Sequence, residues 1–462
     1  MAGALLGAVA VLALACVIVN GSTRIAAADA SSGSVLWEND YAGPAGTRFG
    51  GRDVATSPDG STVYVTGDGP EGYSTLALDA STGQRIWQRR YAGPAGGSGY
   101  ARALALTPDG ATLLVTGGSA AANERTDFAT LAYDASTGAQ LWVRRYDGPG
   151  ARRHGNDAAN AIAVSPDGAT AYVTGSSAGS LTNLDHATIA YDTATGRRIW
   201  THRYDGPDSQ IDGASAIAVG PDGAAVFVTG STDGFLQYGY KYVTAAYDAS
   251  TGAELWRTRF DSHDDAEPGD VARSIGVSPD GTKVFVTGET SNDFVTLAYD
   301  AADGSELWSE RFGGESSTGI DVLAVSPDGS RVFVTGGIVM PIDPVTVFPQ
   351  QAYLVTIAYD ASTGARAWVN RWSGPADIGA SGYAVAVSAD GTEVFAAGVA
   401  YTPKPGLTYG NNYNFATLAY DAATGDRRWV RVLGRGSGVS ISVSPDGTRA
   451  FVTGGSTIAV AS

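Results

Sequence analysis

The chain has 462 residues with 62 glycines, 22 tyrosines and 9 tryptophans but only 2 methionines, a composition that favours short strands joined by tight turns. Its formal net charge of −17 argues against a nucleic-acid partner, because an acidic surface repels phosphate backbones. The only cysteine, Cys16, excludes an internal disulfide framework.

The first feature in chain order is an apolar run over residues 4–19, which has the length of a signal-peptide core and is short for a helix that spans a membrane. Three alanines at positions 26–28 then offer an A-x-A cleavage site before Asp29. No Lys or Arg precedes Arg24, so the basic start of an ordinary leader is missing. We therefore expect residues 1–28 to be a signal peptide or an N-terminal membrane anchor.

Residues 29–462 contain two signatures that alternate with a period of roughly 50 to 60 residues, the range of propeller blades. One is an aspartate turn followed by a tryptophan, as in Asp79, Gly83 and Trp87. The other is a Ser-Pro-Asp-Gly turn or a close relative of it, and we interpret its repeated aspartate as a turn cap. The aspartates of the second signature are Asp59, Asp109, Asp167, Asp222, Asp280, Asp328, Asp390 and Asp446.

Each period holds four candidate strands, as residues 159–200 illustrate. The Ser-Pro-Asp-Gly turn separates the first two strands, and the aspartate turn separates the last two. No stretch is long enough, with helical spacing, to cross over between parallel strands, so an antiparallel meander is expected. Apolar residues on both faces of the strands indicate small sheets covered on both sides, which radial stacking provides.

The two chain ends are expected to share one blade. Residues 457–460 resemble a third strand, so the last blade would take three strands from the C-terminus and its fourth from residues 35–41. Residues 24–28 would then be a surplus third strand that the C-terminal tail replaces. This closure removes free edges and predicts an all-β, eight-bladed β-propeller of four-stranded antiparallel blades, with seven blades as the alternative.

The repeat resembles two known kinds of propeller blade. The Asp-x-x-Thr-Gly-x-x-x-Trp element resembles the blade of PQQ-type quinoprotein propellers, and a longer pattern resembles the bacterial β-propeller repeat called SBBP. The resemblance implies a propeller over nearly everything from Asp29 onward, but no single function, because such blades occur in enzymes, scaffolds and surface proteins. The residues that carry the SBBP resemblance are residues 128–134, Leu141, Trp142, residues 146–148, Asp157, residues 161–164 and residues 172–175.

The quinoprotein resemblance implies PQQ and a calcium ion, commonly beneath a ring of adjacent cysteines. This chain has no cysteine pair, and its tryptophans stand at a repeated position in the outermost strand, which indicates packing. We therefore expect no cofactor and, in particular, no PQQ.

One loop between blades is crowded with oxygen ligands of the kind that bind Ca²⁺. The spacing is not that of an EF-hand, and a solvated acidic loop is the alternative interpretation. The candidate metal ligands are Asp261, Asp264, Asp265, Glu267 and Asp270.

Connectivity sorts the loops onto two faces. The turns within each pair of first and second, or third and fourth, strands are short and lie on one face. The loops between second and third strands, and between blades, lie on the other, which we call the variable-loop face. In blades four, six and seven the loops between the second and third strands are long and carry aromatic residues. Exposed aromatic residues there would suit contact with a glycan or a peptide, and the alternative is that these side chains pack within their own loops. The candidate aromatic rim consists of Tyr238, Tyr240, Tyr401, Tyr409 and Tyr413.

The innermost strands should begin at the mouth of the central channel on the variable-loop face. Five residues before each Ser-Pro-Asp-Gly turn the repeat stops repeating, which indicates a site, because positions that serve only the fold should be alike. The eight residues are Arg52, Arg102, Asn160, Ser215, Arg273, Asp321, Tyr383 and Val439, of which all but Ser215 and Val439 are candidate ligand-binding residues. Alternatively, the arginines pair with acidic loop residues such as Asp157, Asp212 and Asp270.

These features favour a non-catalytic binding module, a monomer that is secreted or lies at the cell surface and contacts the membrane only through its N-terminal segment. Its expected ligand is an extracellular glycan, a peptide or protein, or a small anion, bound near the channel on the variable-loop face. The alternatives are a hydrolase or lyase acting at the channel mouth, where Asp321 is the only carboxylate of the ring, and a degenerate quinoprotein-type oxidoreductase.

Overall fold

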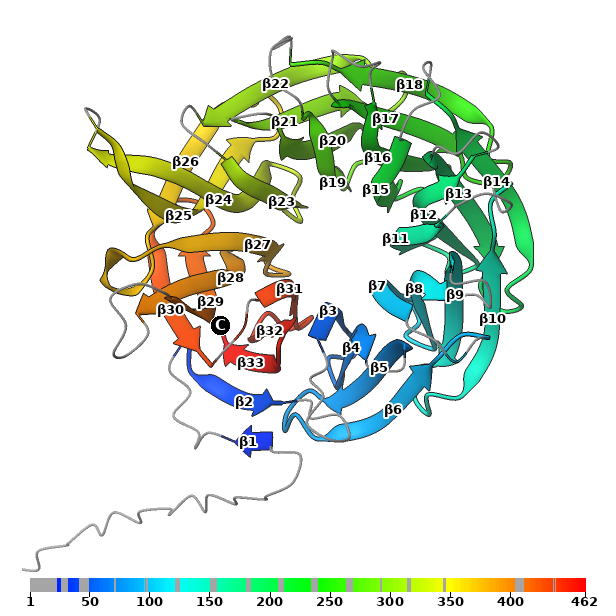
Figure 1. Cartoon of the computed structure of the whole chain (residues 1–462), viewed down its shortest axis with the longest axis horizontal. Helices are drawn as coiled ribbons and strands as arrows, with labels where there is room; N and C mark the ends of the chain where they lie inside the picture. Colours follow the sequence, from blue (N-terminus) through cyan, green and yellow to red (C-terminus); the bar gives the residue numbers. More distant parts are fainter. Residues whose placement is uncertain are drawn as a thin grey trace, which may run out of the picture.

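The computed structural model describes residues 23–25, 32–40, 50–69, 72–94, 96, 99–120, 125–149, 156–179, 184–206, 212–233, 240–262, 269–290, 293–313, 317–343, 346–403, 411–434, 436 and 438–462. They form eight antiparallel sheets that stand as blades in a ring (Figure 1). The expected eight-bladed propeller is confirmed. The described residues include one short 3-10 turn, η2 (Pro375–Asp377), but no helix long and apolar enough to cross a membrane.

In seven of the blades the strands follow one another outward from the centre of the ring in chain order, and in the eighth the outer strands come from the N-terminus. The first strands, at the hub, are β3 (Gly50–Thr56), β7 (Gly99–Leu106), β11 (Ala158–Val164), β15 (Asp212–Val219), β19 (Val271–Val277), β23 (Ser317–Val325), β27 (Ala380–Val387) and β31 (Gly438–Val443). The second strands are β4 (Thr62–Gly69), β8 (Thr112–Ala120), β12 (Thr170–Ala178), β16 (Ala225–Asp233), β20 (Lys283–Glu289), β24 (Arg331–Asp343), β28 (Glu393–Pro403) and β32 (Arg449–Gly454).

The third strands are β5 (Gly72–Asp79), β9 (Thr126–Asp134), β13 (Leu184–Asp192), β17 (Tyr240–Asp248), β21 (Asp293–Asp300), β25 (Thr346–Asp360), β29 (Asn411–Asp421) and β33 (Thr457–Ala461). The outermost strands are β6 (Arg85–Tyr91), β10 (Gln140–Tyr146), β14 (Arg198–Tyr204), β18 (Glu254–Phe260), β22 (Glu306–Gly313), β26 (Arg366–Trp372), β30 (Arg427–Leu433) and β2 (Val35–Asn39). We number the blades 1 to 8 from the blade that begins with β3.

Blade 8 closes the ring in the expected way, with β31, β32 and β33 from the C-terminus and β2 from the N-terminus. Trp37 of β2 pairs with Ala459 of β33, and Trp37 is fully buried. The surplus N-terminal strand is not lost, however. It forms β1 (Thr23–Ile25), which pairs antiparallel with the outer edge of β2 and gives this blade a fifth strand (Figure 1).

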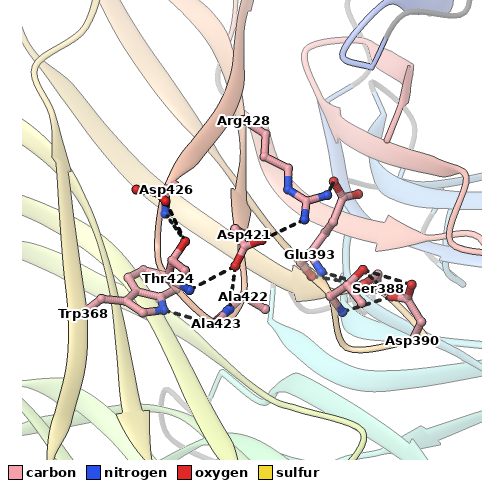
Figure 2. A network of polar contacts seen from close by, with 11 residues as sticks. Trp368, Ser388, Asp390, Glu393, Asp421, Ala422, Ala423, Thr424, Asp426 and Arg428 are labelled. Atoms are coloured by element: carbon pink, nitrogen blue, oxygen red, sulfur yellow. Dashed lines mark hydrogen bonds and ion pairs between the residues drawn. The ribbon is translucent and has the colours of Figure 1, made fainter.

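Aspartate side chains hold the short turns on the face opposite the variable-loop face, as blade 7 shows (Figure 2). Between β27 and β28, Asp390 accepts a hydrogen bond from the hydroxyl of Ser388 at 2.6 Å, and this bond is the main reason that its pKa is lowered. Between β29 and β30, Asp421 accepts two backbone N–H groups at 3.0 Å, and its pKa is lowered chiefly by the guanidinium of Arg428, at 2.9 Å. The repeated aspartates are therefore turn caps.

The outermost tryptophans join neighbouring blades. The indole N–H of Trp87 donates to the carbonyl of Ala135 in the next blade at 2.9 Å, and its ring covers Gly138. Gly138 has a φ of 68°, and a Cβ there would lie 2.6 Å from the ring. The repeated glycine therefore serves both the turn and the contact between blades. At the seam, Gly33 lies against Trp429 in the same way.

Candidate functional site

Every hub strand carries a β-bulge at the same place. In β3 the pairing with β4 passes from Gly51 directly to Asp53, so Arg52 has no partner in the ladder. The register shifts at the corresponding position in all seven other hub strands. The unpaired residues are Arg52, Arg102, Asn160, Ser215, Arg273, Asp321, Tyr383 and Val439, the eight non-repeating positions expected at the channel mouth. We call them the bulge ring.

The glycine that follows threonine in the second strand makes room for the bulge. A Cβ on Gly67 would lie 1.9 Å from the carbonyl oxygen of Gly50 in the hub strand. The corresponding glycines of five other blades, from Gly117 to Gly398, meet the same carbonyl at 2.0–2.1 Å. This glycine, which follows threonine in the other blades and Ala397 in blade 7, is therefore required by the close approach of the bulged strand.

The arginines of the bulge ring differ in their contacts. Arg52 pairs with Asp68 at 2.8 Å, and Arg273 pairs with Glu289. Both pairs are solvent-exposed, with 56% and 43% of the arginine side chains accessible, so each holds its arginine weakly. Arg102 lies over the ring of Tyr100 at 5.0 Å and is exposed. Ion pairing of the ring arginines thus occurs within their own blades, at the ends of the second strands.

The three aspartates named as alternative partners serve the backbone instead. Asp157 accepts the N–H groups of Gly148 and Ala178 at 2.9 and 2.7 Å. Asp212 accepts the N–H of Gly206 at 2.6 Å, and Asp270 accepts that of Ser262 at 2.8 Å. The arginines of the bulge ring therefore do not rely on these loops.

Of the other members of the bulge ring, Ser215 and Val439 are half-buried. Asn160 is half-buried and donates from Nδ2 to the carbonyl of Ala214 in the next hub strand at 2.8 Å, so it links blades 3 and 4. Tyr383 is also half-buried. The side chain of Asp321 lies outside the described residues.

Asp53, directly after the bulge, is a hub carboxylate that the motif analysis did not identify. It accepts the N–H of Leu104 at 2.9 Å and the hydroxyl of Ser440 at 2.8 Å, and so ties blade 1 to blades 2 and 8. Burial raises its pKa despite these bonds. Four other blades have alanine at this position, for example Ala103, so the comparison of blades that revealed the bulge ring would also have revealed Asp53.

The aromatic rim is described in part. Tyr401 and Tyr413 pair across β28 and β29 with their rings 5.4 Å apart and perpendicular, and Tyr413 is 62% exposed. Tyr240 is half-buried at the start of β17, whereas the neighbouring Tyr242 is fully buried and belongs to the core. Tyr238 and Tyr409 lie outside the described residues.

The segments expected as long loops in blades 6 and 7 are largely β-hairpin. In blade 6, β24 and β25 continue beyond the blade and pair as far as Asp343 and Thr346 (Figure 1). In blade 7, β28 and β29 pair as far as Pro403 and Asn411. Continued main-chain pairing makes these projections stiffer than loops, so they present aromatic residues from an ordered support.

The expected metal ligands have local roles where they are described. Asp261 forms an ion pair with Lys241, and Asp270 caps a backbone N–H. The other three residues, Asp264, Asp265 and Glu267, lie outside the described residues.

A different carboxylate cluster lies between blades 2 and 3. Oxygens of Asp127, Asp147 and Asp157 lie within 4.8 Å of one another, a spacing that suits a hard cation such as Ca²⁺. Burial and the two neighbouring carboxylates raise the pKa of Asp147. Asp127 also forms an ion pair with Arg145 at 2.7 Å, so the negative charge of one of the three carboxylates is already balanced within the fold.

The tryptophans do not fit a floor for PQQ. From Trp37 to Trp368, the seven tryptophans at the repeated position of the outermost strand each donate their N–H to a carbonyl of the next blade. Each ring also lies against a glycine of that blade, leaving no open face of the kind on which a flat quinone stacks. These seven tryptophans are therefore committed to contacts between blades.

Solved propellers share this fold at low sequence identity. The propeller of Sqt1 from Chaetomium thermophilum, solved bound to the N-terminus of the ribosomal protein L10, is 14% identical with a TM-score of 0.57 and covers 90% of this chain and 97% of its own. The C-terminal WD40 domain of Sif2 is 11% identical with a TM-score of 0.56, at the same coverage. The computationally designed Ika8 protein is 14% identical with a TM-score of 0.54, again at that coverage. These similarities show the fold alone.

No curated protein matches the chain. A family model described as outer membrane protein assembly factor BamB matches residues 20–188 and 239–462, which is most of the chain. The match supports the PQQ-like repeat, while the SBBP pattern stays a resemblance. The chain therefore belongs to this BamB-like family of PQQ-type β-propellers (PQQ_2).

Proposed function

We propose that this chain is a non-catalytic, extracytoplasmic binding module that holds a segment of a partner polypeptide at the hub on its variable-loop face. The family description names an assembly factor for outer membrane proteins, which favours a polypeptide over a glycan or a small anion as the ligand. The apolar N-terminal run and the alanines that follow it favour export.

The observation that carries the proposal is the bulge ring. A bulge frees one residue of each hub strand from the ladder and re-aims its side chain. The residue before the bulge is glycine or alanine in seven of the eight blades, whereas at the bulge itself arginine, asparagine, tyrosine and aspartate replace one another. Positions that serve only the fold have no reason to differ in this way.

Exposed groups at the hub and on the blade 7 hairpin suit a polypeptide. Arg102, whose only described contact is the Tyr100 ring, can donate to main-chain carbonyls and to carboxylates. Tyr413, on its stiff hairpin, offers a large apolar surface with a polar hydroxyl at low cost in side-chain entropy. Sqt1, which holds a protein N-terminus, is an example of the same fold binding a polypeptide.

The test is an array of immobilised dodecapeptides probed with the full chain. We expect a subset of peptides to bind, and Arg102→Ala and Tyr413→Ala each to weaken that binding by about 10-fold, the equivalent of about 1.4 kcal/mol. Arg85→Ala removes another exposed arginine, from the outer wall, and should leave binding unchanged.

Two results would overturn the proposal. One is binding to a glycan array with no peptide bound, which would replace the polypeptide as ligand. The other is a bound quinone chromophore after incubation with PQQ and Ca²⁺, which would assign the chain to redox chemistry.

A further inference from the structure

The outermost strand of each blade lies at an open end of its sheet, where unpaired N–H and C=O groups can accept another strand. In blades 1 to 7 these strands carry arginine, which is a known means of discouraging such pairing. Each of the seven has at least one, and the strands are β6, β10, β14, β18, β22, β26 and β30.

Strand β2 of blade 8 is the exception. Its sequence, Val-Leu-Trp-Glu-Asn, contains no lysine or arginine. Where blades 1, 3, 6 and 7 have arginine two residues before the tryptophan, β2 has Val35. Among the described sheets, this edge without lysine or arginine is also the one that carries a fifth strand. Strand β1 thus covers the outer edge of β2, which is the one outermost strand that carries no arginine.

The pairing of β1 shows how the edge accepts a strand. β1 lies antiparallel to β2, with Thr23 opposite Asn39 and Ile25 opposite Trp37. β1 is not needed for closure, because the pairing of β2 with β33 and the packing of Gly33 against Trp429 both lie after residue 28. Loss of β1 would therefore open the edge and leave the ring closed.

The alanines at 26–28 directly follow β1, so cleavage there would remove β1 and leave β2 in place. We infer that the outer edge of β2 is an acceptor site for an extended segment of a partner polypeptide, which adds to blade 8 as an antiparallel fifth strand in the place of β1. Main-chain hydrogen bonds would supply the affinity, as in other cases of strand addition. This site on the outer wall is separate from the bulge ring.

The experiment uses the full chain and, as probe, a fluorescein-labelled peptide of residues 21–28, with binding read by fluorescence anisotropy. In the parent chain β1 competes at an effective concentration of about 1 mM, because it is tethered to β2 by a short segment. Arg24→Pro removes a strand N–H and should release β1. We expect the peptide to bind Arg24→Pro at least about 10-fold more tightly than the parent.

Two further variants locate the site. Adding Val35→Arg to Arg24→Pro places on β2 the residue that four other blades carry there and should abolish peptide binding. Adding Gln140→Arg makes the matched change on β10 of blade 2 and should leave binding intact. Because the probe is the chain's own strand, these results report on the edge of β2 whether or not the bulge ring binds peptides.

Amide exchange over residues 35–39 gives a second readout that does not need the labelled peptide. Exchange should be faster in Arg24→Pro than in the parent and should slow again when unlabelled peptide saturates the edge. Equal peptide affinity in the parent and Arg24→Pro, or binding that survives Val35→Arg, would overturn the inference. So would exchange over residues 35–39 that the peptide does not slow.

Discussion

Replacing Asp212 with asparagine should make the propeller more stable at neutral pH. Asp212, the first residue of β15, is fully buried, and burial together with the nearby carboxylates of Asp205 and Asp185 raises its pKa to about 6. Above that pH the fold therefore holds a buried negative charge close to two others. Asparagine has the same shape, and its carbonyl oxygen can still accept the N–H of Gly206.

The size and sign of the effect follow from the pKa. An aspartate that titrates at 3.8 in the unfolded chain and at about 6 in the folded chain binds more protons when folded across that interval. Its favourable contribution is complete below about pH 4 and is lost as the pH rises through 6, a loss of about 3 kcal/mol at most. We expect Asp212→Asn to avoid about 1–3 kcal/mol of this loss at pH 7.

The assay is urea unfolding of the parent and the variant at several values between pH 4 and pH 8. The stability difference should grow from pH 4 to pH 6 and stay constant above it. Asp109→Asn is a control of opposite sign, because the hydroxyl of Thr107 lowers the pKa of Asp109, so that its charge stabilises the fold. A difference for Asp212→Asn that is independent of pH, or that favours the parent at pH 7, would refute the reasoning.

Two other predictions concern the packing between blades. Gly83→Ala should cost about 2–5 kcal/mol in urea unfolding, because φ is 69° and the new Cβ would lie 2.5 Å from the ring of Trp37. Gly60→Ala, with φ of 72° but no atom nearer than 3.4 Å, should cost only about 1 kcal/mol, and equal losses would contradict a role for the tryptophan. Asp53→Ala should cost about 2–4 kcal/mol by leaving the N–H of Leu104 without its acceptor, whereas Asp53→Asn should cost less. The same unfolding assay checks both variants. No loss of stability in the alanine variant would show that the contact between blades 1 and 2 does not depend on this carboxylate.

The architecture was readable from the sequence because its turns and packing contacts repeat. Asp390 and Asp421 cap turns through local bonds that any copy of the motif can make, so residue type and spacing were sufficient to place them. Strand β33 was predictable from its similarity to the other third strands, and with it the closure at Trp37. In each case the same local pattern of residues recurs in every blade, so the structure of one copy predicts that of the others.

The rest of the candidate site depends on contacts that no local pattern contains. Asp53 is held by groups from blades 2 and 8, the latter contributed by Ser440, far away in the chain. The aromatic segments of blades 6 and 7 were expected as loops because their strands lengthen in only these blades and break the period. Tyr242, two residues after the predicted rim residue Tyr240, is buried because it lies within β17 and packs into the core.

The bulge explains why variation concentrates at the hub. A change at Trp87 or at Gly138 disrupts a contact with the next blade, and a change at Gly67 collides with the hub strand, so these positions stay the same around the ring. Arg52 and Arg102 make no ladder pair, so a substitution there changes what the hub presents without breaking the frame. The same argument applies to the outer edge of β2, which differs from its seven counterparts in sequence and in what covers it. Where a repeat holds the fold constant, a position that departs from the repeat is free to acquire a function.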